Sequence, residues 1–423
     1  MMFEKYDAYK DSGVDWIGSI PTHWNVLKLG SIFAQRNEKV SDQDYPALSV
    51  TKNGIVPQLD NAAKTKDGDN RKLVLKGDFV INSRSDRKGS SGLSSLDGSV
   101  SLINIVLKPR KIEPKFSHHL MKCNAFIEEY YRVGRGIVAD LWTTRFEEMK
   151  TMNLALPNIE EQRKITEFLD QKTSEIDQAI AIKEQQIALL NERKQIVIQK
   201  AVTQGLDSNV AMKDSGLNSV GNIPQDWEII KFKYLAKVRY GLGQPPRQLD
   251  NGLKIIRATN VERGKIVEKG MLYIDPNDIP WDRNPTLNKD EIIVVRSGAY
   301  TGDSALVTEE YAGCIAGYDM VATPFNCYPK FLSTVLLSHY VLYEQIYLLR
   351  MRSAQPHLNA EELNELQIVV PPMNQQRLIA NYIEKVEADI GEAISLIKQQ
   401  LEKVKEYKTT LINDAVTGKI KVA

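Results

Sequence analysis

The feature that most constrains this chain is an internal repeat. The segment Asp11–Trp24 (DSGVDWIGSIPTHW) recurs 203 residues later as Asp214–Trp227 (DSGLNSVGNIPQDW), with seven of the fourteen positions identical. A second pair, Leu156–Ile165 (LPNIEEQRKI) and Val370–Ile379 (VPPMNQQRLI), is offset by 214 residues. The sequences between these anchors are far less similar. We therefore expect two divergent globular units, each followed by a constant segment.

The constant segments predict two long helices. From Gln162 to Thr203 there is no Gly or Pro, and from Gln376 to Thr417 only Gly391 interrupts the pattern. Apolar residues recur at spacings of three, four and seven, as on one face of a helix. A helix of about 42 residues is about 63 Å long. Each helix could pack on its own globular unit, but the matching length and phase of the two apolar faces favour an antiparallel pair. The residues expected to form this packing are Ile165, Leu169, Ile176, Ile180, Ile187, Leu190, Ile379, Ile383, Ile390, Ile394, Leu401 and Val404.

The divergent units are predicted to mix helices and strands. Short apolar runs such as Phe79–Ile81, Val100–Leu107 and Ile292–Val295 are typical of strands, whereas Ser117–Tyr131 and Phe331–Leu349 are typical of helices. We expect an α+β protein with two globular domains separated by two long antiparallel helices that form a coiled coil. The predicted boundaries are a first domain at 1–157, a first helix at 158–206, a second domain at 207–371 and a second helix at 372–423.

Signatures of catalysis are missing from the sequence. It contains no G-x-x-x-x-G-K-[ST] loop and no H-E-x-x-H, and its five histidines have no metal-ligand spacing. The three cysteines form no C-x-x-C pair, which favours a reducing, cytoplasmic location. No run of about 18 apolar residues predicts a membrane span. We therefore expect no catalytic residue, no metal site, no bound cofactor and no membrane contact in this chain.

Polar loops after the predicted strands carry side chains suited to nucleic acid. Arg can donate two hydrogen bonds to guanine, Asn and Gln can pair with adenine, and Lys can hold phosphates. The net charge is only +1, so affinity for DNA would need local patches. For any one of these residues a solvated surface side chain is the simpler interpretation, but two divergent sets suggest readers of two short sequences. The candidates are Lys52, Asn53, Arg84, Arg87, Lys88 and Arg135 in the first unit, and Gln244, Arg247, Arg257, Asn260, Arg296 and Tyr300 in the second.

The paired anchors and the helices that they open resemble the specificity subunit of type I restriction–modification systems, over nearly the whole chain. The resemblance implies two target-recognition domains, each reading one half of a bipartite site in double-stranded DNA. It also implies a non-catalytic chain whose helix pair sets the spacer and docks two methyltransferase subunits, with two restriction subunits joining them. S-adenosylmethionine for adenine-N6 methylation, and ATP with Mg²⁺ for cleavage, would then be bound by those partners.

By position, the resemblance carries over architecture and no DNA contacts. The matched residues are interpreted as structural or partner-docking positions: Trp24 and Trp227, Pro157 and Pro371, Gln162 and Gln376, Arg163 and Arg377. Two other hypotheses remain open at this point. One is a coiled-coil scaffold without sequence-specific DNA binding, and the other is a self-contained enzyme, against which the missing motifs argue.

Overall fold

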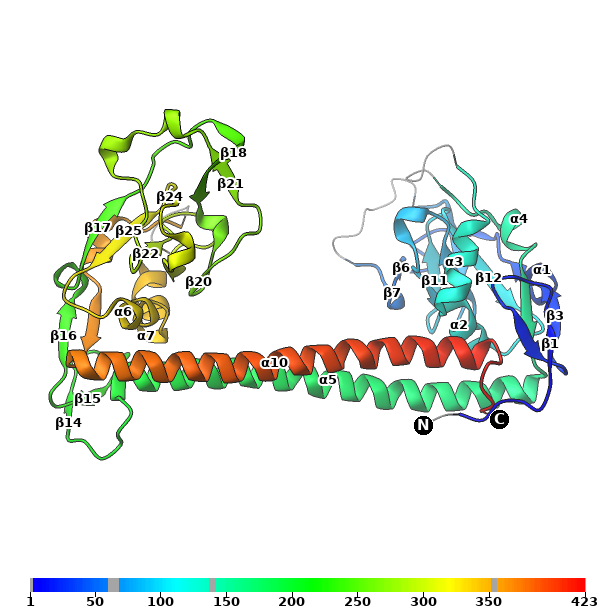
Figure 1. Ribbon diagram of the computed structural model, residues 1–423. Coiled ribbons are helices and arrows are strands. Elements are labelled where there is room, and N and C mark those ends of the chain that lie inside the picture. The colour runs from blue at the N-terminus through cyan, green and yellow to red at the C-terminus, as the bar shows by residue number, and fades with distance from the viewer. Residues whose placement is uncertain (1–2, 60–67, 137–141, 351–355, 423) are drawn as a thin grey trace. The chain divides into compact units, whose positions relative to one another are not determined.

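The computed structural model describes residues 3–59, 68–136, 142–350 and 356–422. Contacts divide the chain into two compact units. Unit 1 comprises Met1–Glu184 and Lys398–Ala423, and unit 2 comprises Gln185–Ile397. Each unit holds one α+β domain and a part of both long helices (Figure 1).

The domain of unit 1 is built on a four-stranded antiparallel sheet of order β10-β9-β12-β4. Its inward side chains, among them Phe79, Ile81 and Leu107, are buried in one core with α2 and α3. A second sheet, β11-β8-β5, and the hairpin β6–β7 lie beside it. The strands are β1 (Tyr9–Asp11), β2 (Ser19–Pro21), β3 (Asn25–Lys28), β4 (Phe33–Gln35), β5 (Lys39–Val40), β6 (Leu48–Thr51), β7 (Gly54–Pro57), β8 (Arg71–Val74), β9 (Phe79–Asn82), β10 (Ser91–Leu93), β11 (Gly98–Val100), β12 (Asn104–Pro109) and β13 (Asn153–Leu156). The helices are α1 (Leu29–Ile32), α2 (Pro114–Lys122), α3 (Asn124–Arg132) and α4 (Phe146–Met149), with a 3₁₀ turn at Ser85–Arg87.

The domain of unit 2 has an equivalent sheet, of order β17-β25-β22-β23, and a second sheet in which β18 pairs with β21 and β24. The strands are β14 (Met212–Asp214), β15 (Asn222–Pro224), β16 (Glu228–Lys231), β17 (Ala236–Tyr240), β18 (Gln248–Ile256), β19 (Val261–Glu262), β20 (Lys265–Ile266), β21 (Leu272–Ile274), β22 (Ile292–Val294), β23 (Ser304–Leu306), β24 (Ile315–Ala316), β25 (Met320–Pro324) and β26 (Gln367–Val370). The helices are α6 (Pro329–Leu336), α7 (His339–Val341), a π-helical turn at Leu342–Ile346, α8 (Tyr347–Arg350) and α9 (Ala360–Asn364).

The internal repeat extends into the divergent regions. Pro109 of β12 lies opposite Phe33 of β4, and Pro324 of β25 lies opposite Ala236 of β17. In the same way β13 pairs with β3 in unit 1, and β26 pairs with β16 in unit 2. The two domains therefore share one topology although their sequences between the anchors differ.

The long helices are α5 (Ile159–Gln204) and α10 (Met373–Val416), and they run antiparallel within each unit. In unit 1, Lys408 Nζ pairs with Asp177 Oδ1 at 2.6 Å and Lys183 Nζ donates to Gln400 Oε1 at 2.7 Å. In unit 2, Lys194 Nζ lies 3.9 Å from Glu387 Oε1. The predicted α+β class with two long antiparallel helices is confirmed.

The predicted apolar face of the helices is buried most deeply where it meets a domain. Ile165 and Leu169 join the core of unit 1, and Ile379 and Ile383 join the core of unit 2. Farther along the helices, Ile187 is only half-buried, because there the two helices cover each other alone. The remaining members of the predicted set divide in the same way: Ile176 and Leu401 are buried, and Ile180, Leu190, Ile390, Ile394 and Val404 are half-buried.

Three predicted elements are shorter than expected. Val100–Leu107 forms two strands, because residues 101–103 turn and the Asn104 N–H donates to the Ser101 carbonyl at 3.0 Å. Ser117–Tyr131 is two helices, since Cys123 adopts an extended backbone between them and accepts from the Phe126 N–H. Phe331–Leu349 is likewise interrupted, between α6 and α7. Among the described residues, no helix is long and apolar enough to cross a membrane.

Candidate nucleic-acid interface

In each domain one tryptophan donates a hydrogen bond to the long helix, and the two tryptophans occupy matching positions of the repeat. In unit 1, Trp24 Nε1 donates to Glu161 Oε1 at 3.1 Å. In unit 2, Trp227 Nε1 donates to Gln375 Oε1 at 2.8 Å. Both indoles are fully buried, so each polar group needs its partner. The repeated tryptophans therefore position the domains, in agreement with their interpretation from the sequence.

A repeated glutamine makes a second attachment. Gln162 Nε2 donates to the Pro157 carbonyl at 2.9 Å, and its Oε1 accepts from the Glu113 N–H at 2.9 Å. Gln376 repeats this arrangement with the Pro371 carbonyl at 2.8 Å and the Tyr328 N–H at 2.8 Å. The buried amide thus joins the entry of the long helix to the residue before α2 or α6.

Arg163 and Arg377, the other matched pair, lie next to these glutamines. The Arg377 guanidinium lies 4.7 Å from the centre of the Tyr328 ring, whereas Arg163 is exposed. The Arg377 contact is consistent with a structural role on α10.

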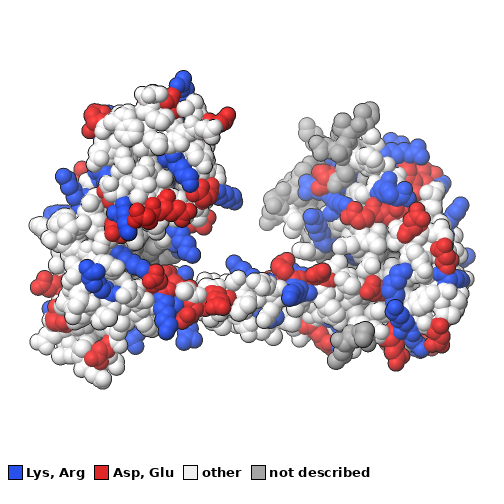
Figure 2. Space-filling view, in the orientation of Figure 1, with Lys and Arg blue, Asp and Glu red and all other residues white. Residues whose placement is uncertain are grey.

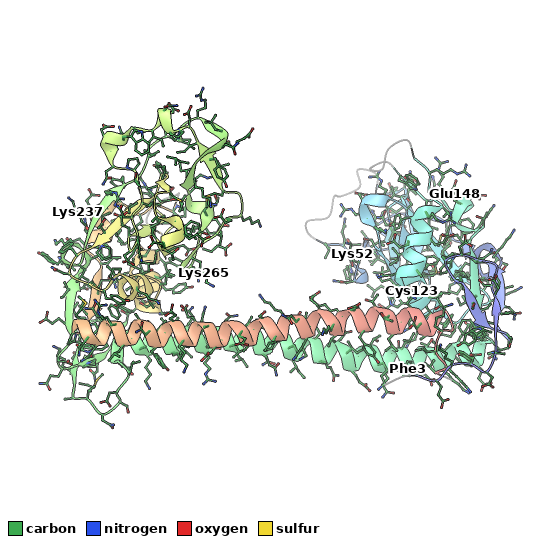
Figure 3. The ribbon with its side chains drawn as sticks, viewed as in Figure 1. Phe3, Lys52, Cys123, Glu148, Lys237 and Lys265 are labelled. Atoms are coloured by element: carbon green, nitrogen blue, oxygen red, sulfur yellow. The ribbon has the colours of Figure 1, made fainter. Side chains whose placement is uncertain are left out.

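In unit 1 the candidate loops border a polar cleft of about 650 Å³. Lys52, in the turn between β6 and β7, and Arg87, in the turn after β9, both line it. Figure 3 labels Lys52 in unit 1. Its buried walls include Arg71, Asn82 and Asn104. The cleft therefore combines exposed cations at the rim with buried amide and guanidinium groups.

The buried polar groups of this cleft are held in place by neighbouring strands. Arg71 Nε donates to Ser99 Oγ at 2.8 Å, and Asn82 Oδ1 accepts from the Arg84 N–H at 3.0 Å. Asn104 Nδ2 donates to the Ser101 carbonyl at 3.1 Å, while its Oδ1 is buried and accepts no hydrogen bond from the described residues. Arg71 and Asn104 were missed by sequence reasoning, because only the pairing of β8 and β12 with their neighbours brings them to the cleft.

The other candidates of unit 1 differ in how far they are already engaged. Asn53 and Arg84 are exposed, whereas Lys88 Nζ pairs with Glu128 Oε2 at 2.6 Å. Arg135 Nε lies 3.7 Å from Glu148 Oε1 and its side chain is largely exposed. The backbones of Arg84 and Arg135 each form an isolated β-bridge with the backbone of Thr143. The loop that contains Arg84 and the loop that contains Arg135 therefore meet at Thr143.

In unit 2 the central feature is Arg296, which follows β22 as Arg84 follows β9. Its guanidinium carbon lies 4.7 Å from the Tyr240 ring centre and 4.1 Å from the Tyr318 ring centre. Nη2 donates to the Tyr318 hydroxyl at 3.1 Å, and the Arg296 N–H donates to Asp319 Oδ1 at 3.2 Å. Stacking between two aromatic rings fixes the plane of the guanidinium.

The Asp319 carboxyl beneath this arginine is buried, and its second oxygen accepts no hydrogen bond in the described part of the chain. Burial raises the pKa of Asp319 to about 6, against the lowering effect of the Arg296 N–H. The carboxylate is therefore a poorly solvated acceptor next to a preorganised arginine.

Within the described residues, no hydrogen bond or ion pair joins the remaining candidates of unit 2 to Arg296. Arg247 pairs with Asp275, and Arg257 Nη2 donates to the Gly270 carbonyl at 2.8 Å. Asn260 is fully buried, and its Nδ2 donates to the carbonyls of Val267 and Lys269. Asn260 therefore shapes a turn rather than presenting its amide at the surface. Gln244 and Tyr300 are exposed.

On the face seen in Figure 2, charge is mixed rather than segregated. Figure 2 shows acidic and basic side chains interspersed on the viewed face of each unit. Among the described residues, no group of three or more His, Cys, Asp or Glu side chains is placed to hold a metal ion.

The fold and these loops define a class of protein with two topologically equivalent α+β domains, each anchored to one antiparallel helix pair and each carrying a different set of polar and basic loops. Comparison with known proteins identifies the class further. Residues 224–406 match the family described as the type I restriction modification DNA specificity domain.

Relatives and solved structures extend the match beyond this segment. The specificity subunit of type I restriction enzyme MjaVIII from Methanocaldococcus jannaschii is 22% identical over 100% of this chain and 98% of its own length. The HsdS subunit from Thermoanaerobacter tengcongensis has a similar fold, with a TM-score of 0.52 and 15% identity over 95% of this chain and 98% of that one. A solved structure concerned with complex assembly and conformational transition of the type I R-M system gives a TM-score of 0.72 with 14% identity, over 94% and 98%. The resemblance to type I specificity subunits is therefore confirmed.

Proposed function

We propose that this chain is the DNA-sequence-recognition subunit of a type I restriction–modification complex. In this proposal each α+β domain reads one half of a bipartite site in double-stranded DNA. The target-recognition domains are placed at 1–157 and 207–371, and the helical segments at 158–206 and 372–423. The observation that carries the proposal is the repeat itself: one fold occurs twice, with different polar side chains after equivalent strands, β9 and β22.

The two domains offer different chemistry to DNA. Unit 1 presents Lys52 and Arg87 at the rim of a cleft whose wall includes the unpartnered Oδ1 of Asn104, a combination suited to phosphates and to a donor group of a base. Unit 2 presents Arg296 with its guanidinium plane fixed, which suits the two acceptors of guanine. The half-sites are therefore expected to differ in sequence.

The helices are proposed to set the spacer and to dock two methyltransferase subunits. Beyond the apolar face that packs between the helices, α5 exposes further large apolar side chains. Leu189 and Ile196 of unit 2, seven residues apart, are 54% and 59% exposed. Such residues on a helix support a docking face for partner helices. Two restriction subunits would then bind to the complex of this chain with the methyltransferase subunits.

Catalysis is assigned to the partners in this proposal. S-adenosylmethionine for adenine-N6 methylation, and ATP with Mg²⁺, would be bound by the methyltransferase and restriction subunits. The chain alone, incubated with labelled S-adenosylmethionine and unmodified DNA, is expected to give background incorporation. Methyl transfer by the isolated chain would refute the assignment and favour a self-contained enzyme.

The decisive test is a domain exchange. The chain is reconstituted with its methyltransferase subunits, and the methylated adenines are mapped by sequencing of the modified DNA. Replacing residues 30–150 with the same region of a related specificity subunit is expected to change one half of a two-part motif and leave the other. A change in both halves, or in neither, would show that the domains are not independent readers. A coiled-coil scaffold without DNA specificity would give no motif that depends on this chain.

A further inference from the structure

The internal repeat makes it possible to compare how the two units cover the same face of their long helices. The registers fix the equivalence: Tyr9 of β1 lies opposite Pro21, and Met212 of β14 lies opposite Pro224. On the helices, the offset of 214 residues matches Lys164 with Leu378 and Phe168 with Tyr382. The face beside the buried tryptophan can therefore be compared residue by residue.

In unit 1 this face is covered by the segment before β1. Phe3 packs edge-on against Phe168, with ring centres 5.6 Å apart, and lies beside α5 (Figure 3). The Tyr6 hydroxyl donates to Glu161 Oε1 at 2.8 Å, and the Tyr6 ring lies 6.3 Å from that of Trp24. An extended segment with two aromatic side chains, three residues apart, thus lies on this face. The pocket of about 410 Å³ that remains beside it is lined by polar and charged groups, among them Glu161 and Lys164.

The segment that follows α10 forms hydrogen bonds with the residues that lie on this face in unit 1. The Lys421 N–H donates to the Glu4 carbonyl at 2.7 Å, and the Tyr9 hydroxyl donates to the Lys419 carbonyl at 3.4 Å. Unit 1 therefore uses two stretches of chain, residues 3–8 and 417–422, on this face.

Unit 2 has a single short connection at the equivalent place. Residues 205–211 link the end of α5 directly to β14, so they replace both stretches of unit 1. This connection does not cover the helix, and a groove of about 390 Å³ remains beside Trp227. The apolar groups that line it are Leu206, Val210, Pro224, Trp227, Leu378 and Ile379.

The groove of unit 2 exposes apolar side chains, whereas the pocket on the equivalent face of unit 1 is lined by charged ones, among them Glu160, Glu161 and Lys164. Leu378 is 60% exposed and Leu206 is 49% exposed, whereas the aromatic side chains on the equivalent face of unit 1 pack against its core. Unit 2 has Leu378 at the position where unit 1 has Lys164, which also makes the groove of unit 2 more apolar. Apolar side chains gathered around an open groove mark an interaction site.

We infer that the Trp227 groove of unit 2 binds an extended segment of a partner protein that carries aromatic side chains and basic residues. The aromatic requirement follows from Tyr6, which lies against Trp24 and Glu161, the unit 1 equivalents of Trp227 and Gln375, and from Phe3 beside it on the same helix face. The basic requirement follows from charge: Asp207 and Asp226 are the only charged residues among those lining the groove. The inference does not depend on which DNA sequence the domains read.

Three fluorescently labelled peptides probe the groove of the full-length chain by anisotropy. The first has the sequence of residues 3–10 (FEKYDAYK), and the second replaces its two acidic residues with lysine (FKKYKAYK). The third replaces its three aromatic residues with alanine (AEKADAAK). The expected order of affinity is second, first, third, with at least tenfold between the second and the third. Equal binding of the first and third peptides would overturn the aromatic requirement, and weaker binding of the second than the first would overturn the basic one.

Variants of the chain locate the site. Leu378→Lys introduces the residue that unit 1 has at the equivalent position, and it should weaken binding of the second peptide at least tenfold. Leu396→Lys is the matched control, because Leu396 is also an exposed leucine of α10 in unit 2 but does not line the groove. It should bind the peptide as the original chain does, and both variants should keep the original helical melting curve.

Two further outcomes would overturn the inference. One is unchanged peptide binding by Leu378→Lys, which would place the peptide elsewhere. The other is concentration-dependent self-association of the chain, measured by sedimentation, that Leu378→Lys abolishes, because the occupant would then be a second copy rather than a partner protein. Neither outcome bears on DNA recognition, which the domain exchange tests separately.

Discussion

Arg36 and Asp78 form a two-bond ion pair beside the four-stranded sheet of unit 1. Arg36 Nε donates to Asp78 Oδ2 at 2.7 Å, and Nη2 donates to Oδ1 at 3.1 Å. Arg239 and Glu291 form the same pair in unit 2, with Nη2 and Oε2 2.8 Å apart. Both carboxylates are buried. The two domains therefore share a charged contact, in which the arginine follows β4 or lies in β17 and the acid precedes β9 or β22.

Removing one partner of this pair is expected to destabilise unit 1 strongly. Asp78→Ala leaves the mostly buried Arg36 guanidinium without its carboxylate, and loss of one partner of a buried pair costs about 3–5 kcal/mol. The double variant Arg36→Met, Asp78→Leu should recover a large part of that loss. Urea unfolding followed by fluorescence checks both. If Asp78→Ala unfolded at the original midpoint, the pair would have no role in stability.

Arg87 is expected to contribute to DNA affinity more than Lys88. Arg87 lines the unit 1 cleft with its side chain 67% exposed, and its Nε lies 3.5 Å from Asp86 Oδ2. Lys88 does not line the cleft and pairs more closely, with Glu128 at 2.6 Å. Arg87→Ala should cost about 1–3 kcal/mol if the side chain reads a base, or lower the salt slope by about one if it holds a phosphate. Arg84→Ala, on the same loop, should act in the same direction. Titration of the reconstituted complex with site-containing DNA at several salt concentrations measures both effects, and unchanged affinity and slope in both variants would exclude this loop.

Arg296 is expected to carry specificity for a guanine in the second half-site. Arg296→Lys keeps the charge but loses the planar fork held between Tyr240 and Tyr318. It should weaken specific binding by about 1–3 kcal/mol and leave non-specific binding unchanged. Lys237→Ala, which removes an exposed charge from β17 of the same unit, is the control and should leave the specificity ratio as it was. Equal losses of affinity for specific and for random DNA would show that Arg296 contacts a phosphate and not a base.

Asp319 makes the stability of unit 2 depend on pH. Because burial raises its folded-state pKa from 3.8 to about 6, its contribution to stability is fully present below the unfolded pKa near 4. That contribution is lost as the pH rises through about 6. Asp319→Asn retains an acceptor for the Arg296 N–H without the charge, so it should raise the melting temperature at pH 7.5. The gain, at most about 3 kcal/mol, should fade toward pH 5. A gain that is the same at both pH values would show that the carboxylate charge is not its cause.

The helices could be predicted because their signal is local. The spacing of Ile165, Leu169 and Ile176 reports a helical face without knowledge of any other element, and the repeated Gln162 and Gln376 lie where each helix begins. Gly205 and Gly418 follow the helix ends in left-handed backbone, with φ of +80° and +72°.

The site could be predicted only in part, because burial and hydrogen bonding depend on contacts between distant strands. Arg71 and Asn104 enter the cleft through the pairing of β8 and β12, which no local pattern reveals. Asn260 has the right chemistry for adenine, but its amide is used by carbonyls seven and nine residues away. The equivalence of Arg36 and Arg239 was hidden as well, since insertions change the offset between the halves along the chain.

Finally, the helix pair is expected to determine the spacer of the DNA site. The apolar face recurs largely every eleven residues, as at Ile165, Ile176 and Ile187, and eleven residues make about three turns. Inserting eleven helix-forming residues after Glu184 in α5 and after Lys398 in α10, near the level where Lys183 contacts Gln400, should keep that face continuous. Each helix then lengthens by about 16 Å, which corresponds to about five base pairs or half a turn of DNA.

The variant with insertions in both helices should stay helical and melt cooperatively, but it should lose the original site and bind one whose spacer is changed. Inserting five residues in both helices is the control, because it rotates the apolar face by about 140° and should lower the melting temperature. Circular dichroism, melting curves and binding to a series of spacer lengths distinguish these results. If the eleven-residue variant folded and still preferred the original spacer, the helix pair would not determine the distance between the half-sites.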